Sequence, residues 1–430
     1  MSREHKRLGW RLGAAALLFV LGVGTGLGLA AWGGEVQAKG RAENGVYQRL
    51  SVFAKVLNYV ETNYVDAVDS ETLIYGAVKG LLDTLDPHSS FLPPDVFKEL
   101  KIDTTGEYQG LGLMIDYDET SPDGGFIIQD VIPGGPADKV KLRRGDGLIK
   151  VDGVDLAGMS MQEATRLLRG PIGSVVHLTV QSTADSTLRE IPLVRAVVHM
   201  TAVASATYKP LGYIRIKAFQ NQTAREVRRT VNRWLSQNPP AVKGIVLDLR
   251  NNPGGLLDEA VGVADIFLDK GVIVSVEGRN TLVAERSMAR KENTWASIPL
   301  ALLMNGGSAS AAEVVAGALQ DSSRALIVGS RSYGKGSVQN IIDLEDGSGL
   351  KLTVARYFTP KHRSIHGVGI EPDMPVADPR ELFMPVEDVR QVLAPSMKAL
   401  IAPRPETGIA ADDWPLLVAY AKLVGDTQRK

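Results

Sequence analysis

The chain has 430 residues, of which 44% are hydrophobic and 23% charged, a balance typical of a folded protein with room for about two to three domains. A formal net charge of −1 and the lack of a basic stripe argue against a nucleic-acid partner. The sequence contains no cysteine, which excludes disulfides, thiolate catalysis and a lipoprotein anchor. No histidine lies in an H-E-x-x-H pattern, which argues against a zinc protease, and we expect no metal and no cofactor.

The first residues have the character of an export leader. Residues 1–11 are basic, and residues 13–32 carry no charge, which is just enough apolar chain to span a bilayer. We expect residues 1–38 to be a signal peptide or an anchor in the inner membrane. Either alternative places the rest of the chain outside the cytoplasm, in the periplasm or cell envelope.

Residues 39–100 are predicted to form a helical segment. A second helix is expected over 71–85, and the turn at 85–94 ends the unit. His88 in that turn is interpreted as a structural residue rather than a catalyst. The first helix is indicated by apolar side chains at helical spacing: Leu50, Phe53, Val56, Leu57 and Val60.

Residues 101–190 change to short strands, glycine turns and one helix over 160–169. The order of these elements resembles a circularly permuted PDZ domain of the bacterial protease type. The resemblance implies that a peptide tail pairs with the strand from Leu113, beside the helix that ends at Arg169. The tail's carboxylate would be bound by amides of the loop Gly110-Leu111-Gly112. The alternative is a small β domain that only spaces its neighbours.

Residues 191–378 are predicted to form an α/β core. Strands alternate with helices, which favours a mostly parallel sheet with ligands at the carboxyl ends of the strands. A buried strand at 244–249 leads into Arg250-Asn251-Asn252-Pro253-Gly254-Gly255, a loop whose free amides are suited to bind an anion. The other strands are expected at 212–219, 271–277, 298–304, 324–329 and 350–358.

Ser310 follows the apolar run 298–304 and precedes a predicted helix over 311–320. At a strand-to-helix corner a serine is exposed beside free amides that can receive an oxyanion. Ser310-x-x-Glu313 is also a capping box, which needs no catalysis. Lys335, on a glycine-flanked turn after the next strand, favours catalysis, because a buried neutral lysine can take the proton of a serine hydroxyl.

These motifs resemble the C-terminal processing (tail-specific) peptidases, the S41 group of serine proteases with a PDZ domain. The match covers nearly all of the chain after the leader and includes 85–90, 249–255, 307–313, 334–339 and 367–373. The resemblance implies that Ser310 is the nucleophile, that Lys335 is the base and that Gln339 orients the lysine. It further implies an oxyanion hole formed by Ala311 N–H and an amide of Gly254–Gly255. The implied fold is a crotonase-like α/β core with an inserted PDZ domain and helical N- and C-terminal segments.

Two positions depart from the family pattern. Ala312 replaces a serine that is not the nucleophile, and Lys361-His362 replace a small residue and glycine before Arg363, which bears on specificity. The segment 379–430 contains two helical patches that we expect to pair with the N-terminal helices of another copy, giving a homo-oligomer. By this hypothesis the substrate is a protein or peptide bound by its C-terminus, and Arg169 couples tail binding to the active site.

Three alternatives compete with this hypothesis, and the first of them, a P-loop nucleotidase, is rejected. Residues 329–335 fit a P-loop, but position 336 is glycine where Ser or Thr would bind Mg²⁺, and no helix follows. A conventional triad would use His362 or His366, although no G-x-S-x-G elbow surrounds Ser310. A PDZ scaffold with a latent protease core is the non-enzymatic alternative, and intact Ser310 and Lys335 argue against it.

Overall fold

The computed structural model of the protein describes residues 37–118, 125–279, 285–381, 393 and 395–428. The predicted leader therefore lies almost entirely outside the described residues. The chain divides into two compact units, residues 1–84 and 85–430. Within the part of the chain that the structure describes, no helix is both long enough and apolar enough to cross a membrane.

The described residues of the first unit form the helices α2 (Gln37–Asn63) and α3 (Ser70–Asp83). The carboxylate of Asp69 caps α3 by accepting the Thr72 N–H at 2.9 Å, and this hydrogen bond lowers the pKa of Asp69. On α2 the apolar side chains Leu50, Phe53 and Val56 are 55%, 44% and 56% exposed. The two helices expected at the start of this segment are thus present, and α2 exposes these three apolar side chains.

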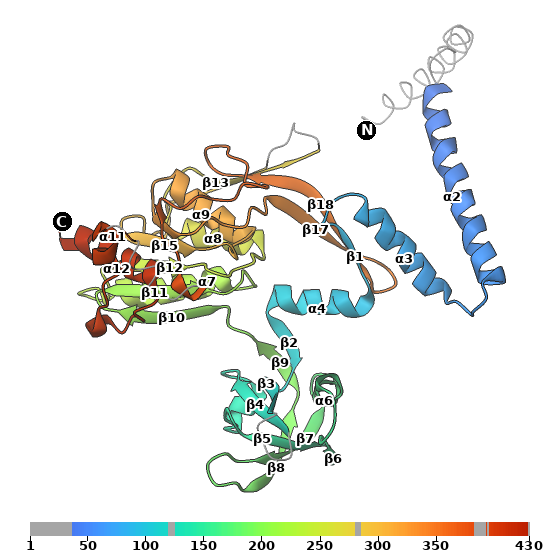
Figure 1. The fold of residues 1–430 in the computed structure, drawn as a ribbon, viewed down its shortest axis with the longest axis horizontal. Coiled ribbons are helices and arrows are strands. Elements are labelled where there is room, and N and C mark those ends of the chain that lie inside the picture. The colour runs from blue at the N-terminus through green and yellow to red at the C-terminus, as the bar shows by residue number, and fades with distance from the viewer. Residues whose placement is uncertain (1–36, 119–124, 280–284, 382–392, 394, 429–430) are drawn as a thin grey trace, which may run out of the picture. The chain divides into compact units, whose positions relative to one another are not determined.

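The second unit is built on a six-stranded sheet in the order β10-β11-β12-β15-β16-β19 (Figure 1). All neighbouring strands are parallel except β10 and β11, which form an antiparallel pair. The strands are β10 (Val203–Tyr208), β11 (Leu211–Ile216), β12 (Gly244–Asp248), β15 (Leu300–Met304), β16 (Leu326–Gly329) and β19 (Met374–Pro375).

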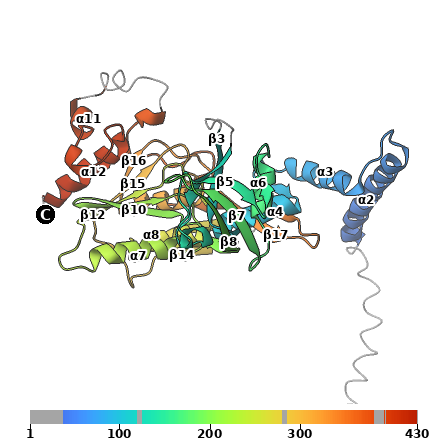
Figure 2. The same ribbon diagram turned by 90° about the horizontal axis from the view of Figure 1, so that it is seen from below.

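Helices cover both faces of this sheet (Figure 2). Successive side chains of a strand enter opposite cores. In β12, Leu247 packs toward α7 (Thr223–Leu235), α8 (Leu257–Asp265) and α9 (Ala311–Asp321). Its neighbour Val246 packs with residues of α12 (Trp414–Gln428), which follows the short α11 (Pro395–Leu400). The C-terminal helix thus covers the protein's own sheet, and most of its apolar side chains are buried there.

A second, five-stranded sheet has the order β1-β18-β13-β14, with β17 paired to β18. All of its pairs are antiparallel. The expectation that strands 271–277 and 350–358 belong to the mostly parallel sheet is therefore wrong, because both lie in this separate layer. The strands are β1 (Ser90–Leu92), β13 (Val272–Gly278), β14 (Glu285–Met288), β17 (Ser337–Asp343) and β18 (Gly349–Phe358).

A β-rich domain is inserted before the core. It leaves helix α4 (Pro94–Thr105) through β2 (Glu107–Gly110) and returns through β9 (Ala196–His199), and these two strands pair with each other (Figure 1). Helix α6 (Met161–Leu168) begins with a complete capping box of Ser160 and Glu163, as the sequence predicts. The remaining elements are β3 (Leu113–Asp118), β4 (Gly125–Val131), α5 (Pro136–Lys139), β5 (Gly147–Val151), β6 (Val154–Asp155), β7 (Val175–Gln181) and β8 (Leu188–Val194).

Candidate active site

Three loops meet at the carboxyl edge of the central sheet, because β12, β15 and β16 are neighbouring parallel strands. The loop after β12 is joined to the loop after β15 by reciprocal bonds between Asn251 and Asn305, at 2.8 and 2.9 Å. Ala309 N–H also donates to Asn252 O at 2.9 Å. In turn, Tyr333 N–H, after β16, donates to Ser308 O at 3.0 Å. The predicted site residues Ser310, Lys335 and Gly254–Gly255 all come from this group of loops.

Ser310 is the residue immediately before α9 and is only 8% exposed. Its φ of 53° lies in the left-handed region, which is strained for a residue other than glycine. Ala311 begins the helix, and its N–H has no acceptor among the described residues. The corner therefore places a serine side chain beside a free amide at the positive end of a helix dipole.

Glu313 connects this corner to the loop of Lys335. The carboxylate is fully buried and accepts the Ser310 N–H at 2.8 Å, which is the contact expected from a capping box. The same carboxylate accepts three donors from the other loop: Ser332 Oγ at 2.6 Å, Gly334 N–H at 2.6 Å and Lys335 N–H at 2.8 Å. Sequence reasoning identified Glu313 as a cap only and missed this second role.

Lys335 is half-buried, and its ammonium forms no ion pair within the described residues. Burial lowers its pKa, and the nearby charge of Lys351 lowers it further, while Glu313 partly opposes both effects. The loop is fixed closely, because a Cβ on Gly336 would lie 2.3 Å from His366 N. These conditions favour a neutral amine, which is the form that can accept a proton.

Gln339 lies on β17, and its amide donates to Ser337 Oγ at 2.8 Å and Thr353 Oγ1 at 3.4 Å. Its predicted contact with Lys335 is absent from the hydrogen bonds of the described residues. Thr353 Oγ1 in turn donates to Asp86 Oδ1 at 3.2 Å, and Thr353 N–H donates to Ser89 Oγ at 3.1 Å. The turn before β1 thereby contacts the active-site side of β18, a connection that the sequence did not indicate.

His88 in this turn donates its N–H to Asp86 Oδ1 at 2.8 Å, in agreement with a structural role. Its ring lies edge-on to His366, with centroids 6.4 Å apart. Burial lowers the pKa of His88, and the positive charge of Lys335 lowers it further. His362, the other histidine considered for a triad, is exposed and stacks on Phe358 at 4.6 Å.

The glycines after β12 approach the serine closely. A Cβ on Gly254 would lie 2.8 Å from Ser310 Cβ and 3.1 Å from Ala311 N, so only glycine fits there. The Gly254 N–H, however, donates to Asn252 Oδ1 at 2.9 Å. Gly255 N–H has no acceptor among the described residues. Of the two predicted loop donors, Gly255 is therefore the one available beside Ala311.

A groove of about 300 Å³ runs between β3 and α6 of the inserted domain. It is closed by the loop that leads into β3, which contains the predicted residues Gly110 and Leu111, followed by Gly112. Tyr108, just before this loop, has a buried hydroxyl with no acceptor or donor at bonding distance among the described residues. The side chains that line the groove from the strand and the helix are Leu113, Met114, Ile115, Met161, Thr165 and Leu168.

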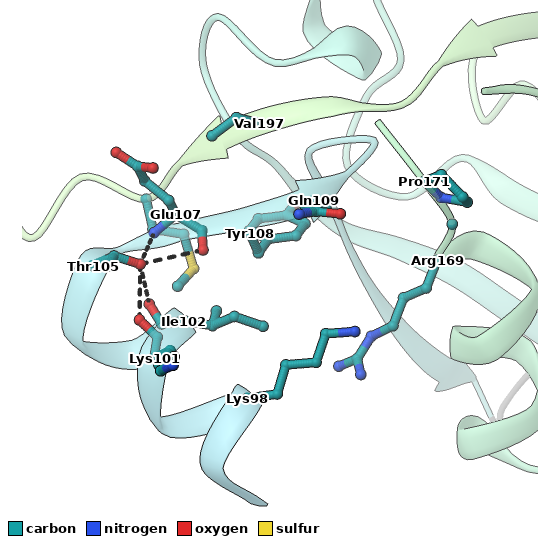
Figure 3. Close-up of a pocket in the computed structure, with 12 residues that line it drawn as sticks. Lys98, Lys101, Ile102, Thr105, Glu107, Tyr108, Gln109, Arg169, Pro171 and Val197 are labelled. Carbon is teal, nitrogen blue, oxygen red and sulfur yellow. Dashed lines mark hydrogen bonds between the residues drawn. The ribbon is translucent and has the colours of Figure 1, made fainter. Parts of the chain in front are cut away.

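A larger cavity of about 830 Å³ adjoins the groove and shares Tyr108, Gln109 and Arg169 with it. Figure 3 shows Lys98 of α4 and Arg169, the residue after α6, directed into this cavity. Neither cation forms an ion pair within the described residues, whereas Lys101 pairs with Asp343 at 2.8 Å. The end of the groove is therefore positively charged. No group of three acidic or histidine side chains suited to a metal occurs in the described ranges.

Comparisons with known proteins agree on one family. Residues 210–376 match the model of peptidase family S41, residues 127–182 match a PDZ domain, and residues 29–95 match the N-terminal domain of the activating protease CtpB. A carboxy-terminal-processing protease of Bartonella bacilliformis is 39% identical over 78% of this chain and 77% of its own. A carboxyl-terminal-processing protease of Synechocystis sp. is 36% identical over 71% of each chain.

Among solved structures, a photosystem II D1 C-terminal processing protease is 32% identical, with a TM-score of 0.45. The alignment covers 84% of this chain and 98% of that one. The sequence relatives and the family match confirm the predicted family, and the α/β core with its inserted PDZ domain confirms the predicted fold class.

Proposed function

Because the chain belongs to peptidase family S41 and resembles its carboxy-terminal-processing proteases, we propose that it is a serine endopeptidase with a Ser310–Lys335 dyad. The observation that carries the proposal is the buried carboxylate of Glu313. It accepts the main-chain N–H groups of both Ser310 and Lys335, each at 2.8 Å. One anchor therefore fixes the nucleophile corner and the lysine loop relative to each other.

The proposed reaction has two stages. Neutral Lys335 takes the hydroxyl proton while Ser310 Oγ bonds to the carbonyl carbon, and Lys335 then gives this proton to the departing amine. In the second stage water bonds to the same carbon, its proton passes to Lys335, and Ser310 Oγ leaves and regains a proton. The developing oxyanion is received by the N–H groups of Ala311 and Gly255. Gln339 orients the lysine through an approach of its side chain during catalysis.

We further propose that the substrate is a protein or peptide bound by its C-terminal tail. The groove beside β3 offers a strand edge, apolar side chains and the loop Gly110–Leu113 for a terminal carboxylate. Lys98 and Arg169 add positive charge at the same end. Arg169→Ala is expected to weaken the preference for a free C-terminus, and unchanged activity together with unchanged tail dependence would remove Arg169 from this role.

The location of the protein outside the cytoplasm is also a proposal, and it rests on the basic and apolar character of residues 1–32. We expect a fusion of residues 1–45 to export a reporter to the periplasm or cell envelope. The mass of the exported product would distinguish a cleaved signal from a retained inner-membrane anchor. A reporter that stays in the cytoplasm would contradict the proposal.

The deciding experiment is degradation of a model protein with an apolar C-terminal tail by leaderless enzyme in the presence of EDTA. Ser310→Ala and Lys335→Ala should abolish cleavage, whereas the exposed controls Ser323→Ala and Lys270→Ala should not. If Lys335→Ala still cleaves, the base lies elsewhere and His362 and His366 are tested next. If the wild-type enzyme is inert but the inserted domain binds the tail, the protein is a binding scaffold or a latent protease.

Amidation of the tail tests the carboxylate site separately from the chemistry. We expect the amidated substrate to be cleaved with an increased KM, because the loop amides and the two cations lose their anionic partner. Equal cleavage of the amidated and the unmodified substrate would show that the groove does not recognise the free C-terminal carboxylate.

A further inference from the structure

Lys351 is a cation near the proposed active site that takes no part in the mechanism above. It lies on β18, which pairs in antiparallel register with β17, the strand that begins two residues after Lys335 (Figure 1). Gln339 of β17 lies opposite Thr353, and Ile341 lies opposite Lys351. Opposite residues of an antiparallel pair, and residues two apart on one strand, direct their side chains to the same side of the sheet.

A hydrogen bond shows that this alternation holds here. The Gln339 amide donates to Thr353 Oγ1 at 3.4 Å, and the irregularity in the register lies before this pair, between Val338 and Gln339. Ile341 and Lys351 are each two positions away from this pair, so they lie on the same side of the sheet as Gln339. We call the side chains of Gln339, Ile341, Lys351 and Thr353 the Gln339 face.

The positive charge of Lys351 has no anionic partner on this face. Its side chain is partly buried, but it forms no ion pair within the described residues. The two carboxylates nearest along the face are bound by other groups. Asp343 pairs with Lys101 at 2.8 Å, and Asp86 accepts the N–H and the hydroxyl of Ser89 at 2.9 and 2.8 Å. An anionic ligand would therefore compensate for the hydration that Lys351 has lost.

Ile341 adds an apolar surface beside this charge. It is 40% exposed and lies directly opposite Lys351, where paired side chains are about 5 Å apart at their Cβ atoms. The site is also within electrostatic range of the proposed base, because the charge of Lys351 adds to burial in lowering the pKa of Lys335. A side chain with methylene groups and a negative charge, as in glutamate or aspartate, matches this combination.

We propose that Lys351 is a specificity-determining residue, whose ammonium binds an acidic side chain of the substrate while Ile341 packs against its methylene groups. This inference rests on the proposed function, because it requires a peptide chain to lie along the Gln339 face as it reaches Ser310. Ile341 lies six positions after Lys335. Because an extended chain advances about 3.3 Å per residue, as a strand does, the acidic residue should lie within roughly six residues of the cleaved bond.

The test uses peptides with one constant apolar C-terminal tail and one constant cleaved bond. A single Glu or Gln is placed at each position in turn, up to about six residues on either side of that bond. The measured quantity is the ratio of kcat/KM for the Glu peptide to kcat/KM for the Gln peptide, which cancels effects on the base and on tail binding. For wild type we expect a ratio of about 10 at one position, the effect of a charge-assisted hydrogen bond in a partly solvated site.

Two substitutions of Lys351 should change this ratio in different ways. Lys351→Gln should reduce it to about 1, because the amide has no charge to pair with the substrate. Lys351→Glu should invert the preference, so that a Lys peptide is cleaved faster than the Gln peptide at the same position. The matched control is Lys270→Glu, which makes the same change of net charge at an exposed position and should keep the wild-type ratio.

Binding is measured separately from chemistry with the Ser310→Ala protein and fluorescent peptides. The Glu peptide should bind about tenfold more tightly than the Gln peptide, and the difference should vanish in Ser310→Ala combined with Lys351→Gln. The proposal is overturned if no position favours Glu in wild type, if the preference persists in Lys351→Glu, or if the two peptides bind equally. Failure of the proposed function would look different, since Ser310→Ala would then still cleave both peptides.

Discussion

At the scale of single residues, the arrangement depends on buried polar groups that each contact more than one loop. Glu313 is the clearest case, because four donors from two loops converge on one buried carboxylate. A buried carboxylate is stabilised only when such donors compensate for its lost hydration. Both the negative charge of the Glu313 carboxylate and the position of its two oxygens are therefore required to bind these four donors.

Glu313→Gln is expected to reduce kcat about 100-fold, because an amide cannot accept all four donors and the Ser310 and Lys335 loops would separate slightly. The free energy of unfolding should fall by about 1–3 kcal/mol, the cost of unsatisfied buried donors. Steady-state kinetics and urea unfolding measure the two effects, with the exposed turn residue Glu345→Gln as control. A normal kcat in a destabilised variant would mean that Glu313 contributes to folding alone.

Lys351 is expected to affect the pH dependence of catalysis. The folded protein lowers the pKa of Lys335 through burial and then through the charge of Lys351, so neutral base is present at lower pH than for a free lysine. Lys351→Met removes one like charge and should raise the pKa of Lys335. The rise of kcat/KM with pH should then shift toward alkaline pH, with a few-fold loss at neutral pH. An unshifted profile, equal to that of the exposed control Lys270→Met, would contradict this role.

At the scale of elements, the strand at 350–358 was predicted from the sequence, but the sheet to which it belongs was not. In β18, polar and apolar residues alternate only from Lys351 to Val354, a pattern typical of an antiparallel strand with one solvated face, and Ala355 then breaks the alternation. The surrounding β-α alternation instead suggested a parallel strand. Part of the sequence pattern therefore indicated an antiparallel strand. The pairing of β18 with β13 and β17, however, joins distant segments and cannot be predicted from a local pattern.

The contacts of the turn at Asp86 also could not be predicted from the sequence. Asp86 and Thr353 form a hydrogen bond although they lie 267 positions apart in the chain. A pair so distant produces no periodic pattern of residues from which the contact could be predicted. Hydrogen bonds from His88, Ser89 and Thr353 lower the pKa of Asp86 although burial opposes them. The carboxylate therefore stays charged and keeps these contacts until the pH falls to its lowered pKa.

We expect Thr353→Val to lower kcat about tenfold with little change in KM. The Gln339 amide would lose one of its two hydrogen-bond acceptors, and its side chain would move away from the position proposed to orient Lys335. The comparison is steady-state kinetics on a tailed substrate, with Thr207→Val on the exposed face of β10 as the matched control. Equal kinetics of the two variants would show that the turn stabilises the fold without positioning Gln339.

Another buried group fixes the loop after β12 to the C-terminal segment. Arg250 pairs with Asp248 at 2.6 Å, with Asp413 at 2.7 Å and with Asp378 at 3.2 Å. Burial opposes its charge, but the hydrogen bonds of Asp248 and Asp413 outweigh this effect and raise its pKa. The loop that contains Gly255 is thereby connected to the helix α12.

Arg250→Met should lower the free energy of unfolding by roughly 3–5 kcal/mol, because buried carboxylates would lose their counter-charge. Urea denaturation of this variant and of the exposed control Arg356→Met measures the difference. A loss below about 1 kcal/mol, as for a surface pair, would mean that the carboxylates find other partners.

At the scale of the whole molecule, the exposed apolar side chains of α2 suggest contact with a second copy. Leu50, Phe53 and Val56 share one side of the helix and are each more than two-fifths exposed, at 55%, 44% and 56%. Because α12 packs on its own sheet, we propose that the partner of α2 is the N-terminal helical segment of another chain. This is a revised form of the sequence-based expectation of a homo-oligomer.

Leu50→Glu combined with Phe53→Glu should therefore dissociate the oligomer. Light scattering at equal concentrations would report the mass of the variant, of wild type and of the control Lys55→Glu, which changes charge on the same helix without altering its apolar side. A wild-type protein that is already monomeric would refute the proposal directly.

The paired strands β2 and β9 give the inserted domain one further property. Because Glu107 lies opposite His199, the chain enters and leaves the domain at adjacent points. Another domain whose first and last residues lie equally close together can take the place of the inserted domain between β2 and β9. The central sheet would not have to change. Recombination within this one strand pair can therefore exchange the inserted domain, and under the proposed function it would change which substrates are bound while the core stays the same.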